Sequence, residues 1–277
     1  MSKLLSAEFR RLFHSLVFKI AAVFSILLAV LLVVVEWSIS PPQTDGMIIL
    51  MGSIYLMFAY PVLVGMSLGT EYSDGTMRNK LIVGHKRSSI YLSKLIVCAV
   101  ADIIVQVVNS GVSLILAVIL YDKVMITCET VVMFAVSIGI ILAFTTILVV
   151  FAMSIQSKAA GAVICLLLTI VMLMCSIFIM ERLNEPEYYE REVYQLASDG
   201  SGDWVETDVK QQKNPYYISG TTRKIYEFLD DLLPFSQLMQ IMDGGIDNIS
   251  AIYTNDIGML VVFTGIGVWI FWKRDLK

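Results

Sequence analysis

The sequence predicts an all-α membrane protein with six transmembrane helices, both termini cytoplasmic, an N-terminal amphipathic interfacial helix and a small extracellular cap between helices 5 and 6. Of its 277 residues 57% are hydrophobic and only 16% are charged, whereas a soluble domain of this length has about a quarter charged. Two further observations support this prediction: the sequence has long apolar runs, and the connections between them are alternately rich and poor in basic residues.

Six apolar segments supply the predicted spans. A hydrocarbon core of about 30 Å is crossed by about 20 apolar residues in a helix. The sixth segment is short, but Thr254, Asn255 and Asp256 precede it and we expect them to cap and lengthen it. Pro61 predicts a kink in the second span, either as a structural feature or as a flexing point. The segments are 18–35, 47–68, 95–120, 131–153, 159–180 and 257–272.

Basic residues alternate between the predicted connections. The connection 37–46 has none and the connection 121–130 has only Lys123, whereas the other side is rich in lysine and arginine. Because positive charge concentrates on the cytoplasmic side, both termini are predicted to be cytoplasmic. We expect a multi-pass protein of the cell membrane, namely a bacterial plasma membrane. The basic residues on that side are Lys3, Arg10, Arg11, Lys19, Arg78, Lys80, Lys86, Arg87, Lys94, Lys158, Lys273, Arg274 and Lys277.

Residues 1–17 have the pattern of an amphipathic helix on the inner leaflet. An ordinary cytoplasmic lead-in to the first span is the alternative, but both the pattern and the sign of the charge favour the interfacial helix. Its predicted apolar face comprises Leu5, Phe9, Leu12, Phe13 and Leu16.

Residues 181–255 form the predicted extracellular cap, which is acidic and rich in tyrosine. Its second half predicts two short helices, interrupted by Pro234 and ended by Gly244 and Gly245, with enough apolar side chains to re-enter the outer leaflet. We expect the acidic first half to attract a cationic or amphipathic peptide. Residues 256–277 form the last span and a cytoplasmic tail.

Motifs for catalysis and metal binding are weak or absent. No phosphate-binding loop is present, so this chain is not expected to bind nucleotide itself. The residues from Gly65 to Gly69 match G-x-S-x-G, yet no predicted span has a histidine to activate the serine. The favoured interpretation is that Gly65 and Gly69 form a face for close helix packing. We expect no catalytic residue, no metal site and no nucleic-acid partner.

A polar stripe follows the third span, where Asp102, Gln106, Asn109 and Ser113 recur at steps of four, three and four. This spacing places them on one helical face, and such groups usually face protein or a water-filled path. The stripe predicts either a translocation route or a hydrogen-bonded helix seam. In the second case, we expect Asp102 to be hydrated near the cytoplasmic end or to meet Lys94.

The segment 69–94 is the most distinctive cytoplasmic connection. Gly75 and Gly84 bracket TMRNKLIV, which predicts a short amphipathic helix. A basic loop that only sets the topology is one interpretation, and a docking surface for a cytoplasmic partner is the other. The apolar face of the short helix favours docking.

This segment resembles the region after the second span in ABC-2 type ABC transporter permeases. Their pattern combines an acidic residue, Gly-Thr-x-x-x-Leu, a basic-Ser turn and a lysine that opens the third span. The usual proline of the turn is absent, and Gly84-His85-Lys86 stands in its place. The stretch DLLPFSQLMQIMDGG is similar to the family's sequence before the last span. The matching residues of the pattern are Glu71, Gly75, Thr76, Leu81, Arg87, Ser88 and Lys94.

The resemblance implies a permease subunit of an ATP-driven exporter. Such permeases pair with a separate ATPase subunit, which binds ATP and Mg, and with a second permease copy or paralogue. The implied substrate is a peptide, bacteriocin, drug or lipid-like molecule. The alternatives are a membrane immunity or sensor protein that binds a peptide at its cap, and a less favoured intramembrane hydrolase. Within the connection 70–94, the implied ATPase-coupling residues are Glu71, Gly75, Thr76, Arg78, Leu81 and Arg87.

Overall fold

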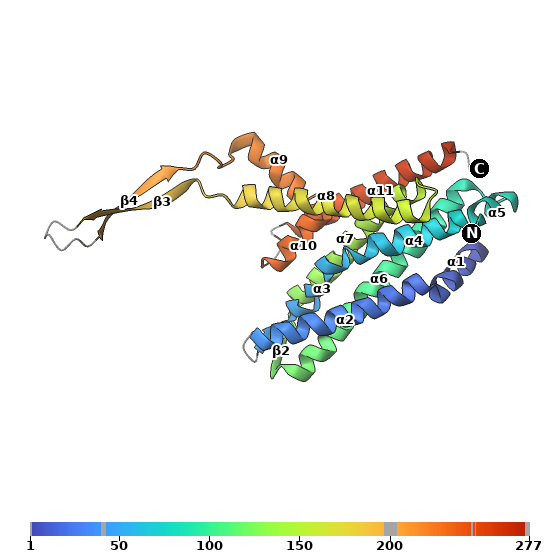
Figure 1. Ribbon diagram of the computed structural model, residues 1–277, viewed down its shortest axis with the longest axis horizontal. Coiled ribbons are helices and arrows are strands. Elements are labelled where there is room, and N and C mark those ends of the chain that lie inside the picture. The colour runs from blue at the N-terminus through green and yellow to red at the C-terminus, as the bar shows by residue number, and fades with distance from the viewer. Residues whose placement is uncertain (1, 40–42, 197–203, 245, 247, 275–277) are drawn as a thin grey trace. The chain divides into compact units, whose positions relative to one another are not determined.

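The computed structural model describes residues 2–39, 43–196, 204–244, 246 and 248–274. The chain divides into two compact units. The larger contains Met1–Leu173 and Asp231–Lys277, and the smaller contains Met174–Asp230. The larger unit is a bundle of long helices (Figure 1), and it contains every candidate functional residue discussed below unless the smaller unit is named.

The described residues include five helices long and apolar enough to cross a membrane, and a bent pair that makes a sixth candidate span. The protein is therefore a multi-pass, all-α membrane protein. A helix α1 (Ser2–His14) precedes the first of them. The five long helices are α2 (Leu16–Ile39), α6 (Arg87–Leu120), α7 (Cys128–Met153), α8 (Lys158–Asn184) and α11 (Ile249–Lys273).

The second predicted span is broken rather than merely kinked. It consists of the 3-10 helix η1 (Gly46–Ile49), α3 (Met51–Leu56) and α4 (Ala59–Ser73), and its two halves meet at 46°. The break falls at Met57 and Phe58, because Pro61 has no N–H to donate to the Met57 carbonyl and its ring clashes with that oxygen. Pro61 itself lies in the first turn of α4, where proline is tolerated.

The last span begins eight residues earlier than predicted. Asn248 caps α11, since its side chain accepts a hydrogen bond from the backbone N–H of Ala251. The prediction of a cap at Thr254, Asn255 and Asp256 was therefore wrong, because an additional helical turn and a half precedes these residues.

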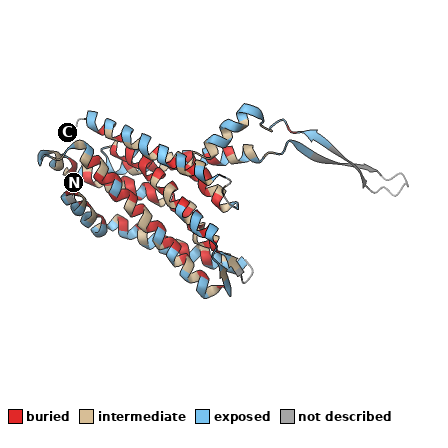
Figure 2. Cartoon of the chain, turned by 180° about the vertical axis from the view of Figure 1, so that it is seen from behind, coloured by how far each residue is buried: buried red, intermediate tan, exposed pale blue. Residues whose placement is uncertain are grey.

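Helix α7 lies at the centre of the larger unit. Of the candidate spans it has the most buried window, and buried residues follow the interior helices in Figure 2. Helix α10 (Pro234–Met242) packs against α7 and α3. The Phe235 ring lies 5.9 Å from that of Phe58 and 6.1 Å from that of Phe144, measured between centroids. The strands β1 (Gln43–Asp45) and β2 (Lys123–Met125) pair in parallel and join two interhelical connections.

The smaller unit contains an antiparallel hairpin, which the sequence analysis did not predict. Strand β3 (Tyr188–Leu196) pairs with β4 (Trp204–Lys213), and α9 (Gly220–Asp230) follows. The signal is the density of tyrosine and valine, residues that favour strands. Abundant acidic residues lie between them, so the segment was interpreted from its charge and not as a pair of strands. The two short helices expected on either side of Pro234 are present as α9 and α10.

Candidate functional site

The connection between α4 and α6 folds as a short helix between two tight turns. Helix α5 (Thr76–Ile82) follows Gly75 and precedes Gly84, whose φ angles are +65° and +94°. These left-handed conformations are readily adopted by glycine. The Thr76 hydroxyl donates to the Glu71 carbonyl oxygen at 3.0 Å, which fixes the start of α5 against the end of α4.

Beneath α5 lies a group of charged side chains that we term the ion-pair cluster: Glu8, Arg11, Glu71, Asp74, Lys80 and Lys94. The buried ammonium group of Lys94 contacts both Glu8 and Glu71. Lys80 also contacts Glu8, and its Nζ lies 2.7 Å from Glu71 Oε2. With three acids and three bases, the cluster is formally neutral, which offsets the desolvation of its buried members.

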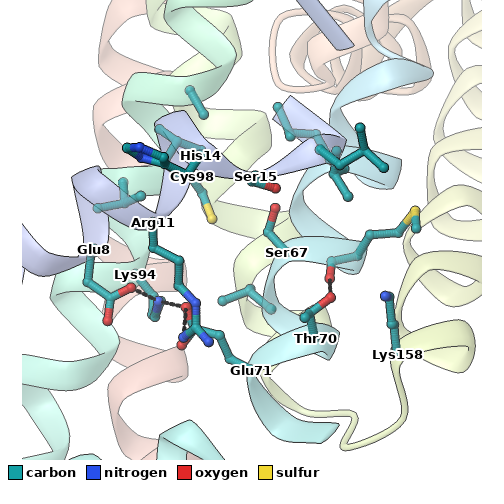
Figure 3. A pocket seen from close by; sticks show the side chains of 18 of the residues that line it. Glu8, Arg11, His14, Ser15, Ser67, Thr70, Glu71, Lys94, Cys98 and Lys158 are labelled. Carbon is teal, nitrogen blue, oxygen red and sulfur yellow. Dashed lines mark hydrogen bonds and ion pairs between the residues drawn. The ribbon is translucent and has the colours of Figure 1, made fainter. Parts of the chain in front are cut away.

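Arg11 connects the rim of the cluster to α1. Its guanidinium lies 3.5 Å from carboxylate oxygens of both Glu71 and Asp74, and it donates to the Thr76 hydroxyl at 3.1 Å. Figure 3 shows Arg11 and Glu8 reaching from α1 toward Glu71 and Lys94. Four helices, α1, α4, α5 and α6, thus contribute side chains to one cluster.

At Glu8 and Lys80 the electrostatics of the cluster favour the charged form of the side chain. Burial alone raises the pKa of Glu8, but the positive charges and hydrogen bonds of Lys94 and Lys80 outweigh burial, so this pKa lies below its ordinary value. Burial likewise lowers the pKa of Lys80, but Glu71 and Glu8 together raise it above its ordinary value. Both residues are therefore held ionised at neutral pH.

A second set of hydrogen bonds joins the same end of the bundle to α7 and α11. Arg87, the first residue of α6, donates to the carbonyl oxygens of Phe271 (3.1 Å) and Arg274 at the end of α11. Arg274 donates to Met153 O at the end of α7 at 2.7 Å, and the Tyr72 hydroxyl donates to the same oxygen at 2.8 Å. Cations are favourable at helix C-termini, where carbonyl groups lack helical partners.

The apolar side chains of α5 and its C-cap lie on two sides of the helix. Arg78 is exposed. Leu81 is only partly buried and packs against the core, and Met77 is fully buried. The outward apolar surface is instead formed by Ile82 and Val83, which are 74% and 77% exposed.

The polar stripe on α6 is buried at a seam with neighbouring helices. Gln106 accepts a hydrogen bond from the Tyr60 hydroxyl at 3.0 Å and donates to Ser53 Oγ at 2.6 Å. Asn109 donates to the carbonyl oxygen of Ser25 at 2.8 Å. Ser113, one turn further along, is also buried.

Asp102 does not meet Lys94, which is engaged by Glu8 and Glu71. Its Oδ2 accepts a hydrogen bond from the Thr145 hydroxyl of α7 at 2.6 Å. Its Oδ1 is buried and has no hydrogen-bond partner among the described residues. Asp102 therefore lies at the α6–α7 contact, away from the ion-pair cluster.

Gly65 and Gly69 lie where α4 approaches the start of α8. A Cβ atom at Gly65 would lie 2.6 Å from the Cα of Ala162, and one at Gly69 would overlap the Cα of Lys158. Between them, the Ser67 hydroxyl has no hydrogen-bond partner in the described chain, and Nδ1 of His14 is bonded to the Arg10 carbonyl. Ser67 and His14 thus form no nucleophile–base hydrogen bond in this structure.

Of the cluster, only Glu71 was among the predicted coupling residues, and Lys94 was named in the family pattern but not as a coupling residue. The predicted site residues did not include Glu8, Arg11, Asp74 or Lys80. Leu4, Glu8 and Leu12 recur every four residues and are all buried, so they form the face of α1 that packs inward. This buried face is not the apolar face that the sequence predicted, since two residues of the predicted face, Phe13 and Leu16, are 50% and 70% exposed. An acidic residue flanked by leucines at this spacing was the available signal.

Two further findings concern chemistry and substrate binding. In the ranges that the structure describes, no group of three or more His, Cys, Asp or Glu residues is arranged to hold a metal ion. In the smaller unit, Glu185 accepts hydrogen bonds from Tyr189 and Asn214, both at 2.7 Å, and is thus engaged at the base of the hairpin.

Comparison with known proteins agrees with this arrangement of apolar helices. The family model described as ABC-2 family transporter protein matches residues 4–176, which include α1, the ion-pair cluster and the polar stripe. No curated protein matches the chain. Since the matched region covers more than half of the sequence, the chain belongs to the ABC-2 family of transporter membrane proteins.

Proposed function

We propose that this chain is the permease subunit of an ATP-driven exporter and that a separate ABC ATPase moves it through α5. Membership of the ABC-2 family supports a permease role. The observation that carries the coupling proposal is the ion-pair cluster. It joins α5 to α1 and α4 through Lys80, and Lys94 joins α1 and α4 to α6.

In this proposal the ATPase docks on the tip of α5. Arg78 offers a positive charge there, and Ile82 and Val83 offer exposed apolar area. Displacement of α5 would pull on Lys80, which contacts Glu71 of α4 and Glu8 of α1. Because breaking a buried pair costs about 3–5 kcal/mol, the linked helices would move together rather than separate.

The movement would reach the rest of the bundle by two paths. Arg87 links the start of α6 to the end of α11, and the polar stripe of α6 contacts α2, α3, α4 and α7. Pro61 and the break before it would let the halves of the second span move separately. In this account ATP and Mg bind to the ATPase, and a second permease copy or paralogue completes the transporter. The substrate is a peptide, bacteriocin, drug or lipid-like molecule.

The test is co-purification with the ABC ATPase, followed by transport in proteoliposomes. Loss of a central apolar contact weakens an interface by about 2 kcal/mol or more, which is about 30-fold in Kd. We therefore expect the double variant Ile82→Asp, Val83→Asp to bind the ATPase at least 30-fold more weakly. The exchange Ile82→Val, Val83→Ile keeps the apolar area and should bind normally.

Two outcomes would contradict the proposal. Normal ATPase binding and transport by the double aspartate variant would show that α5 is not the docking surface. A chain that binds a cationic peptide but neither recruits an ATPase nor supports transport would instead favour the immunity or sensor function.

A further inference from the structure

We propose that a groove between α2 and α4 binds one anionic membrane lipid, with its phosphate headgroup near Ser67 and Lys158 and an acyl chain along the two helices. This inference goes beyond the proposed transport function, because it concerns a resident lipid and does not depend on an ATPase or an export step.

The groove consists of two adjoining cavities. The first, of about 490 Å³, lies beside the corner between α1 and α2 and is shown in Figure 3. The second, of about 320 Å³, lies further along α2 and α4. They share Val17, Ile20, Leu63 and Met66 as lining residues, so one continues into the other.

The first cavity has a polar end with one unsatisfied hydroxyl group. The Ser67 hydroxyl is buried without a hydrogen-bond partner in the described chain, and Figure 3 shows it directed toward the α1–α2 corner. A buried hydroxyl without a partner is costly, and a phosphate oxygen would satisfy it. Thr70 is not free in the same way, since its hydroxyl donates to the Met66 carbonyl at 2.7 Å.

The charge at this end is positive. Glu8 and Glu71 line the cavity but are paired with Lys80 and Lys94. Arg11 is paired with Glu71 and Asp74 within the neutral cluster, so Lys158 is the cation left over at this end. Lys158 directs its amine toward the cavity (Figure 3), and it forms no ion pair among the described residues. The surplus positive charge selects an anionic headgroup over a zwitterionic one.

The second cavity is suited to an acyl chain. Its lining is apolar side chains throughout, including Phe24, Phe58 and Val62. The cavity reaches the break in the second span, where α3 bends away from α4. A hydrocarbon chain in this space would bury apolar surface at about 25 cal/mol per Å².

The dimensions fit one leaflet. From Thr70 to Ala59, α4 rises about 16 Å, which is close to half of the roughly 30 Å hydrocarbon core. The polar end lies where α2 begins, and α2 is a candidate membrane span from Leu16 onward. A phosphate at that boundary with a chain running inward is the geometry of a membrane lipid. Free phosphate would use only the polar end.

Native mass spectrometry of the purified full chain in detergent tests this proposal, with dioleoyl phosphatidylglycerol, dioleoyl phosphatidylcholine, dihexanoyl phosphatidylglycerol and glycerol phosphate as probes. We expect one long-chain phosphatidylglycerol to bind at least tenfold more tightly than the other three. Lys158→Gln and Ser67→Ala should each weaken its binding at least fivefold and leave phosphatidylcholine binding unchanged. The matched control is Lys19→Gln, an exposed lysine of α2 that lines neither cavity; it should change binding less than twofold.

Three results would overturn the proposal. Equal binding of the two long-chain lipids would remove the role of the headgroup charge. Glycerol phosphate or the short-chain lipid binding as tightly as the long-chain one would indicate an anion site without an acyl-chain groove. An equal loss in Lys19→Gln and Lys158→Gln would indicate diffuse attraction to the positive interface.

Discussion

Glu8 illustrates how a single residue joins distant parts of this chain. It lies on α1 and contacts Lys80 of α5 and Lys94 of α6, residues more than 70 positions away. In the sequence it is one acidic residue in a basic segment, and nothing local identifies its partners. Its role depends on tertiary packing, which is why the predicted site included Glu71 and Arg87 but not Glu8.

The pH dependence of stability should report on Glu8. Its pKa in the folded protein is lowered from 4.5, so its contribution is present above pH 4.5 and is lost as the pH falls through the folded value. Replacement by glutamine leaves Lys80 and Lys94 short of a counter-charge at neutral pH. We expect Glu8→Gln to lower the melting temperature at pH 7 by several degrees, and this difference from the wild type to shrink as the pH falls below 4.5. A difference independent of pH would show that the glutamate charge is not stabilising.

Lys80 should report on the stability of the same cluster at high pH. Its pKa is raised from 10.5, so its contribution is complete below pH 10.5 and is lost as the pH rises through the folded value. In a thermal-shift series Lys80→Met should therefore differ from the wild type at pH 7–10 and converge with it above the raised value. The exposed Lys86 provides the control, since Lys86→Met should leave the whole profile unchanged.

Asp102 gives a prediction about transport. Its described hydrogen bond comes from the Thr145 hydroxyl, and the carbonyl oxygen of an asparagine accepts such a bond equally well. We therefore expect Asp102→Asn to retain transport at equal membrane abundance. Asp102→Leu should reduce transport at least tenfold, because it leaves the buried Thr145 hydroxyl without this acceptor, at a cost of about 1–3 kcal/mol. Equal loss in both variants would show that the negative charge itself is required.

At the scale of the helices, the contact between α4 and α8 leaves little room for added volume, because the neighbouring atoms belong to the backbone. The Cβ of an alanine at Gly65 would lie 2.6 Å from the Cα of Ala162. The backbone of α4 or α8 would therefore have to move to accommodate it. We expect Gly65→Ala to destabilise the protein by about 1–3 kcal/mol. Gly111→Ala on α6 is the control: nothing lies within 4 Å of its added Cβ, and alanine favours a helix by about 0.8–1 kcal/mol. Equal melting temperatures for the two variants would show that the α4–α8 approach does not constrain the fold.

The helices that depend on local sequence could be predicted, whereas the elements that depend on tertiary packing or strand pairing could not. Long apolar runs mark spans directly, and Gly75 and Gly84 mark the ends of α5 because both have positive φ angles. The break in the second span was expected only as a kink, since the bend angle depends on how α3 and α10 pack. The β3–β4 hairpin depends on pairing between strands rather than on apolar periodicity, so the composition of the acidic segment did not reveal it.

At the scale of the larger unit, the start of α1 and the end of α11 lie at the same end of the helix bundle (Figure 1). Glu8 contacts Lys94 near the start of α6, and Arg87 of the same helix contacts the end of α11. An even number of crossings produces this arrangement. We therefore expect the bent pair to cross as one span, although by length and composition it is also compatible with a re-entrant loop.

Cysteine labelling distinguishes six crossings from five. The halves of the bent pair, Gly46–Leu56 and Ala59–Ser73, rise about 16 and 22 Å. Although they are bent by 46°, the two halves together extend about 33 Å along the axis of the second half, which is enough to cross a core of about 30 Å.

With the exposed Cys128 and Cys175 replaced by serine, an impermeant maleimide applied to intact cells should label Lys123→Cys and Lys213→Cys. Asn79→Cys on α5 and Lys273→Cys at the end of α11 should react only after permeabilisation. Labelling of Asn79→Cys in intact cells, with Lys273→Cys still protected, would contradict the six-span topology and the cytoplasmic position of α5 on which ATPase docking depends.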